Sequence, residues 1–171
     1  RCLRRVNSSS AASSLGNRFG VDMSKGFTYD PANSVERSPS LLIFSRDNKL
    51  LTTHPITEGP DQHERLNRVQ SFTGQSLKGP EDSVAVLKLA DTAKDTPNRE
   101  ADSSVSAAGR AQALAFKYGK GRVLVQGEAA MLSAQIAGQN KQPMGMNVPG
   151  NDNKQYALNV MHWLSGLLKE K

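Results

Sequence analysis

The pattern of apolar residues centres on one stretch of the chain, residues 116–135. Within it, residues 122–126 form a short β-branched and apolar run that predicts a strand. Gly119 and Gly121 precede that run and favour a tight hairpin with the strand expected at 110–117. Beyond Gly127, the spacing of alanine, leucine and isoleucine over residues 129–136 predicts a helix packed on a sheet.

The rest of the pattern predicts further elements on both sides of this stretch. Apolar runs predict strands at 41–44, 69–72 and 84–89, and Pro55 argues against a helix at 54–59. A short helix fits residues 11–19, closed by Gly20. The last helix begins at Asn151 or Asp152 and carries an apolar stripe that includes Trp163, which we expect to pack against the sheet.

Strands and helices in this mixed order predict a small α/β sandwich, with a sheet flanked by helices. The 171 residues suit one domain. We expect residues 1–14, rich in Arg and Ser, to form a frayed tail and residues 15–171 to form a single α/β domain. The apolar strand and glycine turn that normally open such a sheet are not found near residue 1, which favours a domain truncated at its N-terminus.

Composition and charge argue against several kinds of binding partner and of site. With 37% apolar and 22% charged residues, the chain has the composition of an ordinary soluble globular protein. Half of the net charge of +6 comes from Arg1, Arg4 and Arg5, and the remainder is scattered, which argues against a nucleic-acid partner. No run approaches the ~20 apolar residues of a membrane span. The single cysteine, Cys2, excludes a disulfide within the chain and a cysteine-based zinc site. A homo-oligomer stays open.

Glu128 is the first candidate for chemistry, because ligands of open α/β sheets gather where a strand ends and a helix begins. A carboxylate there suits a general base or a metal ligand, with Ser133 and Gln135 beside it on the expected helix. The alternative is a glutamate that only stabilises the start of that helix. Ser133 lacks the Gly-x-Ser-x-Gly pattern of serine hydrolases.

Two other polar clusters stand out. Asp61 and His63 follow a Gly-Pro bend and suit a divalent cation or an activated water, although Asp61 also suits a helix cap. Asn151 and Asp152 lie in an oxygen-rich turn that suits calcium, but the twelve-residue calcium loop pattern is absent and a cap of the last helix accounts for both residues. His54, in the extended segment before the bend, and Tyr118 are candidates for substrate binding.

Three segments resemble ThuA-like and related class I glutamine-amidotransferase-like domains, many of them bacterial and uncharacterised. They are His54-Pro55-Ile56-Thr57-x-Gly59, Phe72-Thr73-Gly74, and Gly119-Lys120-Gly121-Arg122-Val123 with a Trp-bearing last helix. The resemblance covers roughly residues 54–168 and implies a flavodoxin-like sheet. It does not carry amidotransferase chemistry, because no cysteine lies at the strand-to-helix turn and a Gly-Glu pair stands where these domains often have Gly-His.

Two functions follow as hypotheses. The first is a hydrolase of a small ester, lactone or sugar-derived substrate, in which carboxylate- or metal-activated water attacks and Glu128 is the base. The second is a non-catalytic module that binds a carbohydrate or a protein at the same sheet edge. Residue 1 is not Met and no intact signal peptide is visible, so the sequence is consistent with a processed or partial chain of a bacterial cytoplasm, periplasm or secretome.

Overall fold

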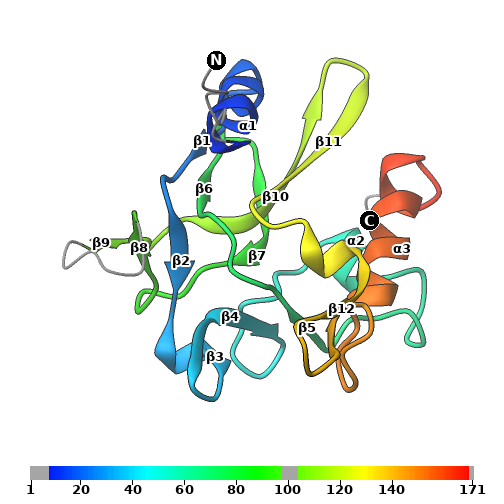
Figure 1. Cartoon of the computed structure of the whole chain (residues 1–171). Coiled ribbons are helices and arrows are strands. Elements are labelled where there is room, and N and C mark those ends of the chain that lie inside the picture. Colours follow the sequence, from blue (N-terminus) through cyan, green and yellow to red (C-terminus); the bar gives the residue numbers. More distant parts are fainter. Residues whose placement is uncertain (1–7, 98–103, 170–171) are drawn as a thin grey trace, which may run out of the picture.

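The structure is a computed structural model that describes residues 8–97 and 104–169. Short strands dominate it, with one helix at each end of the described chain (Figure 1). The helices are α1 (Ser8–Arg18), α2 (Pro55–Glu58) and α3 (Asn153–Leu164), with 3-10 turns η1 (Pro31–Asn33) and η2 (Ala130–Leu132). The strands are β1 (Asp22–Met23), β2 (Phe27–Tyr29), β3 (Ser34–Val35), β4 (Ser38–Ser45), β5 (Arg68–Gln70), β6 (Leu77–Lys78), β7 (Val84–Lys88), β8 (Lys94–Thr96), β9 (Val105–Ser106), β10 (Ala111–Tyr118), β11 (Gly121–Gln126), β12 (Ala134–Ala137) and β13 (Gln142–Gly145).

The hairpin of β10 and β11 is the longest paired unit. Its register runs from Ala113 opposite Gln126 to Tyr118 opposite Gly121. The turn places Gly119 at a φ of 57°, which glycine adopts without the steric cost that a side chain would bring. The hairpin predicted from the glycine spacing is therefore confirmed. Its strand β10 also pairs with β7 and β6, which makes a five-stranded sheet in the order β1, β6, β10, β11, with β7 on β10.

All strand pairs in the described part of the chain are antiparallel. The expected flavodoxin-like α/β fold, which needs a parallel sheet, is therefore wrong. A parallel pair requires a crossover of a dozen or more residues, usually a helix, whereas β10 reaches β11 through a two-residue turn. The remaining strands form three small separate sheets: β2, β8 and β9, then β3, β4 and β5, and the hairpin of β12 and β13.

The helix expected over residues 129–136 is also wrong. Only Ala130–Leu132 turns, as η2, and Ser133 is already extended. Ala134–Ala137 then pairs with Gln142–Gly145 as β12 and β13. The backbone hydrogen bonds that a helix would have supplied come instead from hairpin partners five to eleven residues later, which local apolar spacing does not reveal.

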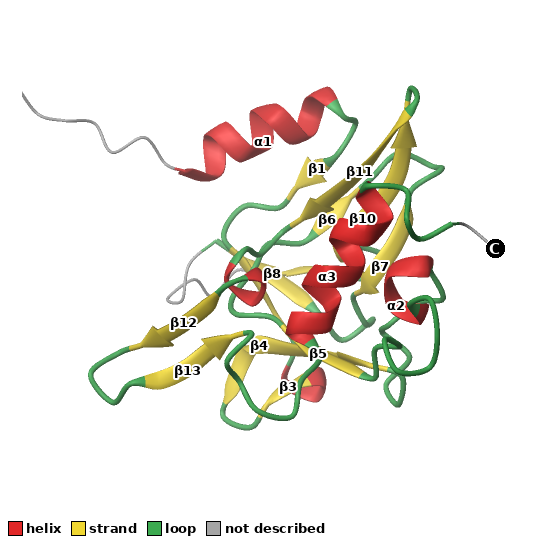
Figure 2. Cartoon of the chain, turned by 90° about the vertical axis from the view of Figure 1, so that its right-hand side faces the viewer, coloured by secondary structure: helices red, strands yellow, loops and turns green. Residues whose placement is uncertain are grey.

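The core lies on both faces of the central hairpin. On one face, Leu114 and Phe116 of β10 pack with Val123 and Val125 of β11, near β1, β6 and α1. On the other face, Ala113, Ala115 and Leu124 pack with Tyr156, Val160 and Trp163 of α3. The helices α1 and α3 therefore lie on opposite sides of the hairpin (Figures 1 and 2). The expected packing of Trp163 against the sheet is confirmed, since its side chain is almost fully buried there.

Three further expectations concern the N-terminal residues, Pro55 and membrane-spanning segments. Residues 8–14 of the expected tail belong to α1, and residues 1–7 lie outside the described residues. Pro55 does not prevent a helix, because proline suits the first turn, and it opens the four-residue α2. No helix within residues 8–97 and 104–169 is long and apolar enough to cross a membrane.

Candidate functional site

Glu128 follows β11 at the point where the sequence predicted a site. Its carboxylate accepts hydrogen bonds from the backbone N–H of Ala130 and from that of Met131, the latter at 2.9 Å. The residue is 7% exposed. Burial raises the pKa of Glu128 above its ordinary value, and bonds from backbone N–H groups, including that of Phe72, oppose the shift. Both carboxylate oxygens therefore serve the start of η2, which is the structural one of the two roles weighed for this residue.

The surroundings of Glu128 are tightly packed. A Cβ added at Gly74 would lie 2.5 Å from the Glu128 Cβ and 2.6 Å from the Nε2 atom of Gln112. Gln112 is fully buried, and neither of its side-chain polar atoms has a partner among the described residues. Beside it, Thr73 has a φ of 65°, which is rare for a β-branched residue. The sequence signal for Gln112 was a single amide inside an otherwise apolar strand, and sequence reasoning missed it.

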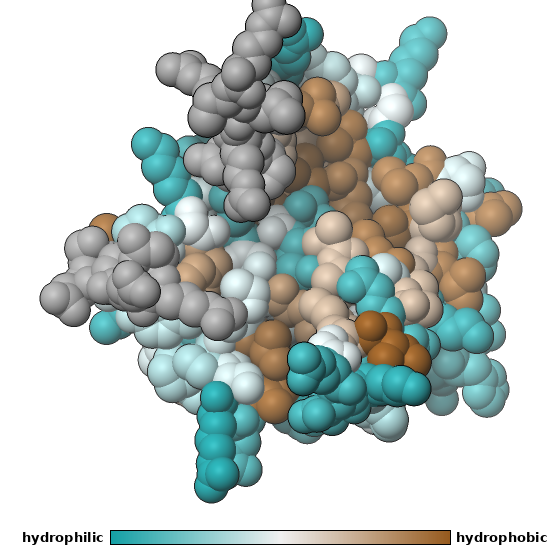
Figure 3. All heavy atoms as spheres, in the orientation of Figure 1, coloured by the Kyte–Doolittle hydropathy of each residue, from teal (hydrophilic) through white to brown (hydrophobic). Residues whose placement is uncertain are grey.

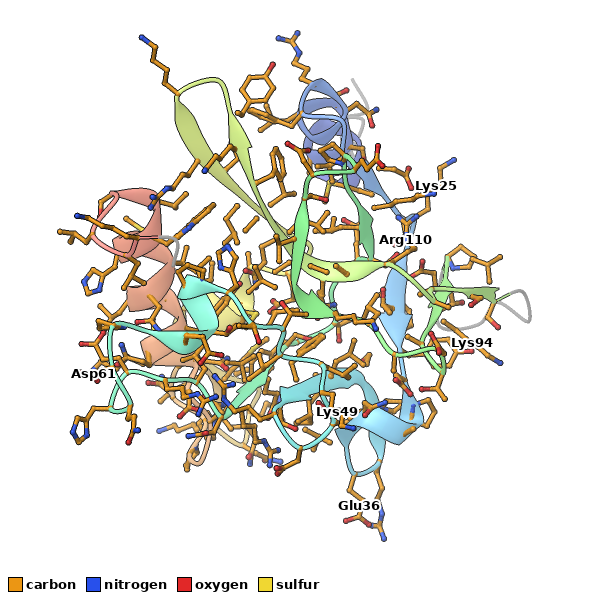
Figure 4. The ribbon with its side chains drawn as sticks, turned by 180° about the vertical axis from the view of Figure 1, so that it is seen from behind. Lys25, Glu36, Lys49, Asp61, Lys94 and Arg110 are labelled. Carbon is orange, nitrogen blue, oxygen red and sulfur yellow. The ribbon has the colours of Figure 1, made fainter. Side chains whose placement is uncertain are left out.

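A cleft of about 1100 Å³ opens beside Glu128, between α1 and the end of β11. Its polar lining includes Asn17, Lys25, Thr73 and Gln75. Lys25 is exposed at this side of the molecule (Figure 4). No histidine, cysteine or second carboxylate lines the cleft, so the described residues offer Glu128 no imidazole or thiol with which to share a proton.

Asp61 and His63 lie elsewhere, in an exposed loop on the opposite side of the molecule from Lys25 (Figure 4). The Oδ1 atom of Asp61 accepts hydrogen bonds from the backbone N–H of His63 at 2.8 Å and of Glu64 at 3.3 Å. These bonds are those of a capping carboxylate, although residues 61–64 form bends rather than a helix. The structure thus does not bring this pair together with Glu128.

The other candidate residues also make structural contacts. The Nδ1 atom of His54 accepts a bond from the Ile56 N–H at the start of α2, and its ring meets that of Trp163 edge-on at 5.1 Å. The Ser133 hydroxyl donates to the Ala130 carbonyl and accepts from the exposed Gln135 amide. Tyr118 lies at the tip of the β10–β11 hairpin, where its ring packs edge-on against that of Phe19 at 5.0 Å.

Of the two proposed calcium ligands, Asp152 holds the start of α3 against β5, and Asn151 bonds within the turn before the helix. The Oδ2 atom of Asp152 accepts from the backbone N–H of Asn67 at 2.7 Å and of Arg68 at 3.0 Å. The Oδ1 atom of Asn151 accepts from the N–H of Asn153 at 3.1 Å, a turn just before the helix. Asp152 is the N-cap residue of α3 but makes no side-chain capping bond. Across the described residues, no group of three or more His, Cys, Asp or Glu side chains is placed to hold a metal ion.

Comparisons with known proteins show a similar fold but assign the chain to no family. No protein-family model matches the chain, and no curated protein matches it. Among solved structures, the chain is similar to the mmIFT52 N-terminal domain, with a TM-score of 0.57 and 16% sequence identity. The match covers 90% of this chain and 56% of that one, so the chain spans little more than half of the matched domain. At this identity the similarity concerns the fold alone.

These findings correct the class assigned from the sequence. The antiparallel, β-rich architecture and its similarity to the mmIFT52 domain replace the expected α/β, amidotransferase-like hydrolase. The resemblance of the three motifs to ThuA-like domains stays a prediction, because the matched domain does not bear on it. What the motifs do in this structure is local: they form the α2 cap, the turn beside Glu128 and the central hairpin.

Proposed function

We propose that the chain is a non-catalytic module that binds another protein, and that α3 provides the docking surface. The observation that carries this proposal is a row of apolar side chains on the outward face of α3. Leu158, Met161 and Leu164 are 44%, 63% and 38% exposed. They are spaced three residues apart, which places them as neighbours on the helix surface. Leu167, just beyond the helix, is 72% exposed and extends the row.

The row is unusual because the inner face of α3 is already occupied by the core residues Tyr156, Val160 and Trp163. A surface helix normally has one apolar stripe facing the core and polar residues opposite. Single exposed apolar residues are common, but a contiguous group marks an interaction site more often than chance. Figure 3 shows apolar side chains gathered over the side of the molecule that carries α3.

The cleft beside Glu128 supports the same proposal, because its residues are poorly suited to catalysis. The carboxylate oxygens of Glu128 are engaged by backbone N–H groups, and the histidines of the sequence lie outside the cleft. A general base commonly works with a second group that takes part in the proton transfer, and the described lining of this cleft holds no imidazole, thiol or second carboxylate. We therefore assign Glu128 a structural role and keep the binding function for the face of α3.

The proposal is tested with a benzophenone photo-crosslinking residue placed at Met161, and at Lys94, which is exposed on β8, as the control. A partner protein should be trapped from Met161 and not from Lys94, and is then purified for calorimetry. Burying a Met side chain contributes about 1.5–3 kcal/mol. Met161→Glu should thus raise Kd at least about tenfold, while Lys94→Glu leaves it within about threefold. Equal trapping from both positions, or an unchanged Kd for Met161→Glu, would overturn the proposal.

A further inference from the structure

Strand β11 ends its sheet with an open edge. It pairs with β10 on one side and with no other strand of the described chain. Residues 111–116 of β10 are all buried, whereas all six residues of β11 are at least partly exposed. In an antiparallel ladder, alternate residues turn both their N–H and C=O groups away from the partner strand. Three of the six residues of β11 therefore present unpaired backbone groups along this edge, which is a template for another strand.

The open edge is flanked by apolar surface. A groove of about 260 Å³ runs between α1 and β11, lined by Leu15 and Phe19 of the helix side and by Val123, Leu124 and Val125 of the strand. Leu15 is 60% exposed. Figure 3 shows apolar side chains over this region, between α1 and the side of the molecule that carries α3.

Both faces of β11 impose the same requirement on a neighbouring strand. Val123 and Val125 face the α1 side of the sheet, and Leu124 faces the α3 side. A strand added at this edge would continue both faces. It must therefore carry apolar side chains on both sides at its centre, as strands buried on two faces do.

Positive charge at the turn end of the β10–β11 hairpin indicates which charge the added strand should carry. Arg18 and Lys120 are exposed, and neither has an ion pair with an acidic residue of the described chain. The contact between the rings of Phe19 and Tyr118 brings the end of α1 to the hairpin turn, so the two cations belong to one end of the edge. An acidic residue on the incoming strand would complement them. A second copy of this chain, with its own net charge of +6, is disfavoured by repulsion.

We infer that β11 accepts an additional strand from a partner protein: an extended segment with an apolar centre and an acidic end that lies against the β10–β11 turn. The backbone edge supplies affinity through main-chain hydrogen bonds, and the groove and the cations select the sequence. This surface is separate from the outward face of α3, so the inference stands independently of the proposed α3 docking.

The test uses a labelled peptide, Ser-Thr-Val-Ile-Val-Thr-Glu-Asp, as the probe, because the C-terminal end of a strand that pairs antiparallel with β11 lies at the β10–β11 turn. Fluorescence anisotropy and amide hydrogen exchange are the readouts. Binding should slow exchange at the amides of β11. N-methylation of the consecutive Val and Ile, which keeps the side chains but removes one N–H from each edge of the peptide, should weaken binding at least about tenfold. Replacing Glu and Asp by Lys should weaken it as well, and Lys120→Glu should largely remove that preference, because it leaves one cation and one anion at this end of the edge. Met161→Glu should leave peptide binding unchanged.

Three results would overturn the inference. One is no binding at about 1 mM peptide, and another is equal binding of the N-methylated peptide. The third is strong protection, in the peptide-free protein, of the β11 amides that point away from β10. In that case a dimeric mass by light scattering would assign the edge to a second copy, and a monomeric mass would assign it to the protein's own polypeptide.

Discussion

Replacing Glu128 by Ala separates a structural carboxylate from a catalytic one. The substitution removes the acceptor of two backbone N–H groups at the start of η2, and the Met131 N–H is buried. A net loss of about 1 kcal/mol for each bond gives about 2 kcal/mol. Relief from burying a charged carboxylate returns part of it, so we expect a destabilisation of about 1–2 kcal/mol. For a chain of this size, that lowers Tm by about 2–8 °C.

The assay is thermal and urea unfolding of Glu128→Ala beside two further variants. Glu128→Gln keeps one carbonyl oxygen as an acceptor and should lose about half as much. Asp61→Ala is the matched control, because its carboxylate also accepts two backbone N–H bonds but lies in an exposed loop. It should stay within about 0.5 kcal/mol of the wild type. A Glu128→Ala protein as stable as the wild type would refute the capping role and return Glu128 to the candidates for chemistry.

Three other predictions concern stability. Because burial raises the pKa of Glu128 above its ordinary 4.5, the folded state holds the carboxyl proton more tightly than the unfolded state does. The stability advantage of the wild type over Glu128→Gln should therefore be greatest below pH 4.5 and fall as pH rises through the folded pKa. A difference in urea midpoints that does not change with pH would contradict this. Asn153→Ala removes buried bonds of 2.9 and 2.8 Å to the backbone of Gln70 and should cost about 2–4 kcal/mol in urea unfolding. Asn153→Asp should cost at least as much at pH 7, because it buries a charge and turns a carboxylate oxygen toward the Gln70 carbonyl; a loss below about 1 kcal/mol for either variant would refute the two-bond account. Arg122→Ala removes guanidinium bonds to two carbonyls near the end of α3 and should cost about 1–2 kcal/mol, against less than about 0.5 for Lys120→Ala at the exposed turn; similar Tm values for both variants would contradict it.

The parts of the fold that sequence reasoning predicted are those governed by neighbours in the chain. Gly119 needs a positive φ, which indicated the β10–β11 turn, and the apolar stripe of the last helix correctly placed Trp163 in the core. The predicted start of the last helix at Asn151 or Asp152 was also correct, because α3 begins at Asn153 with Asp152 as its N-cap residue. The helix over residues 129–136 failed because an apolar spacing that suits a helix also suits a short turn followed by a strand, and the partner strand β13 decides between them.

The candidate site shows the same division. The sequence placed a carboxylate at the end of β11, but the partners of Glu128 depended on how η2 turned back toward it. Asp61 and His63 seemed suitable companions from residue type alone, and only the path of the loop separated them from the cleft (Figure 4). The buried Gln112 and the strained Thr73 were missed, because burial and backbone angle are properties of the folded chain.

The sequence by itself determined where this chain turns, which short runs are extended, and that its last helix packs through Trp163. These features depend on backbone sterics and on apolar spacing within about a dozen residues. Tertiary structure alone decided that the strands pair in antiparallel order and that the carboxylate of Glu128 accepts bonds from backbone N–H groups. It also decided that no other strand of the described residues pairs with the outer edge of β11 and that the outer face of α3 is exposed there. Each of these depends on contacts between residues far apart in the chain, whose free energy local patterns do not encode.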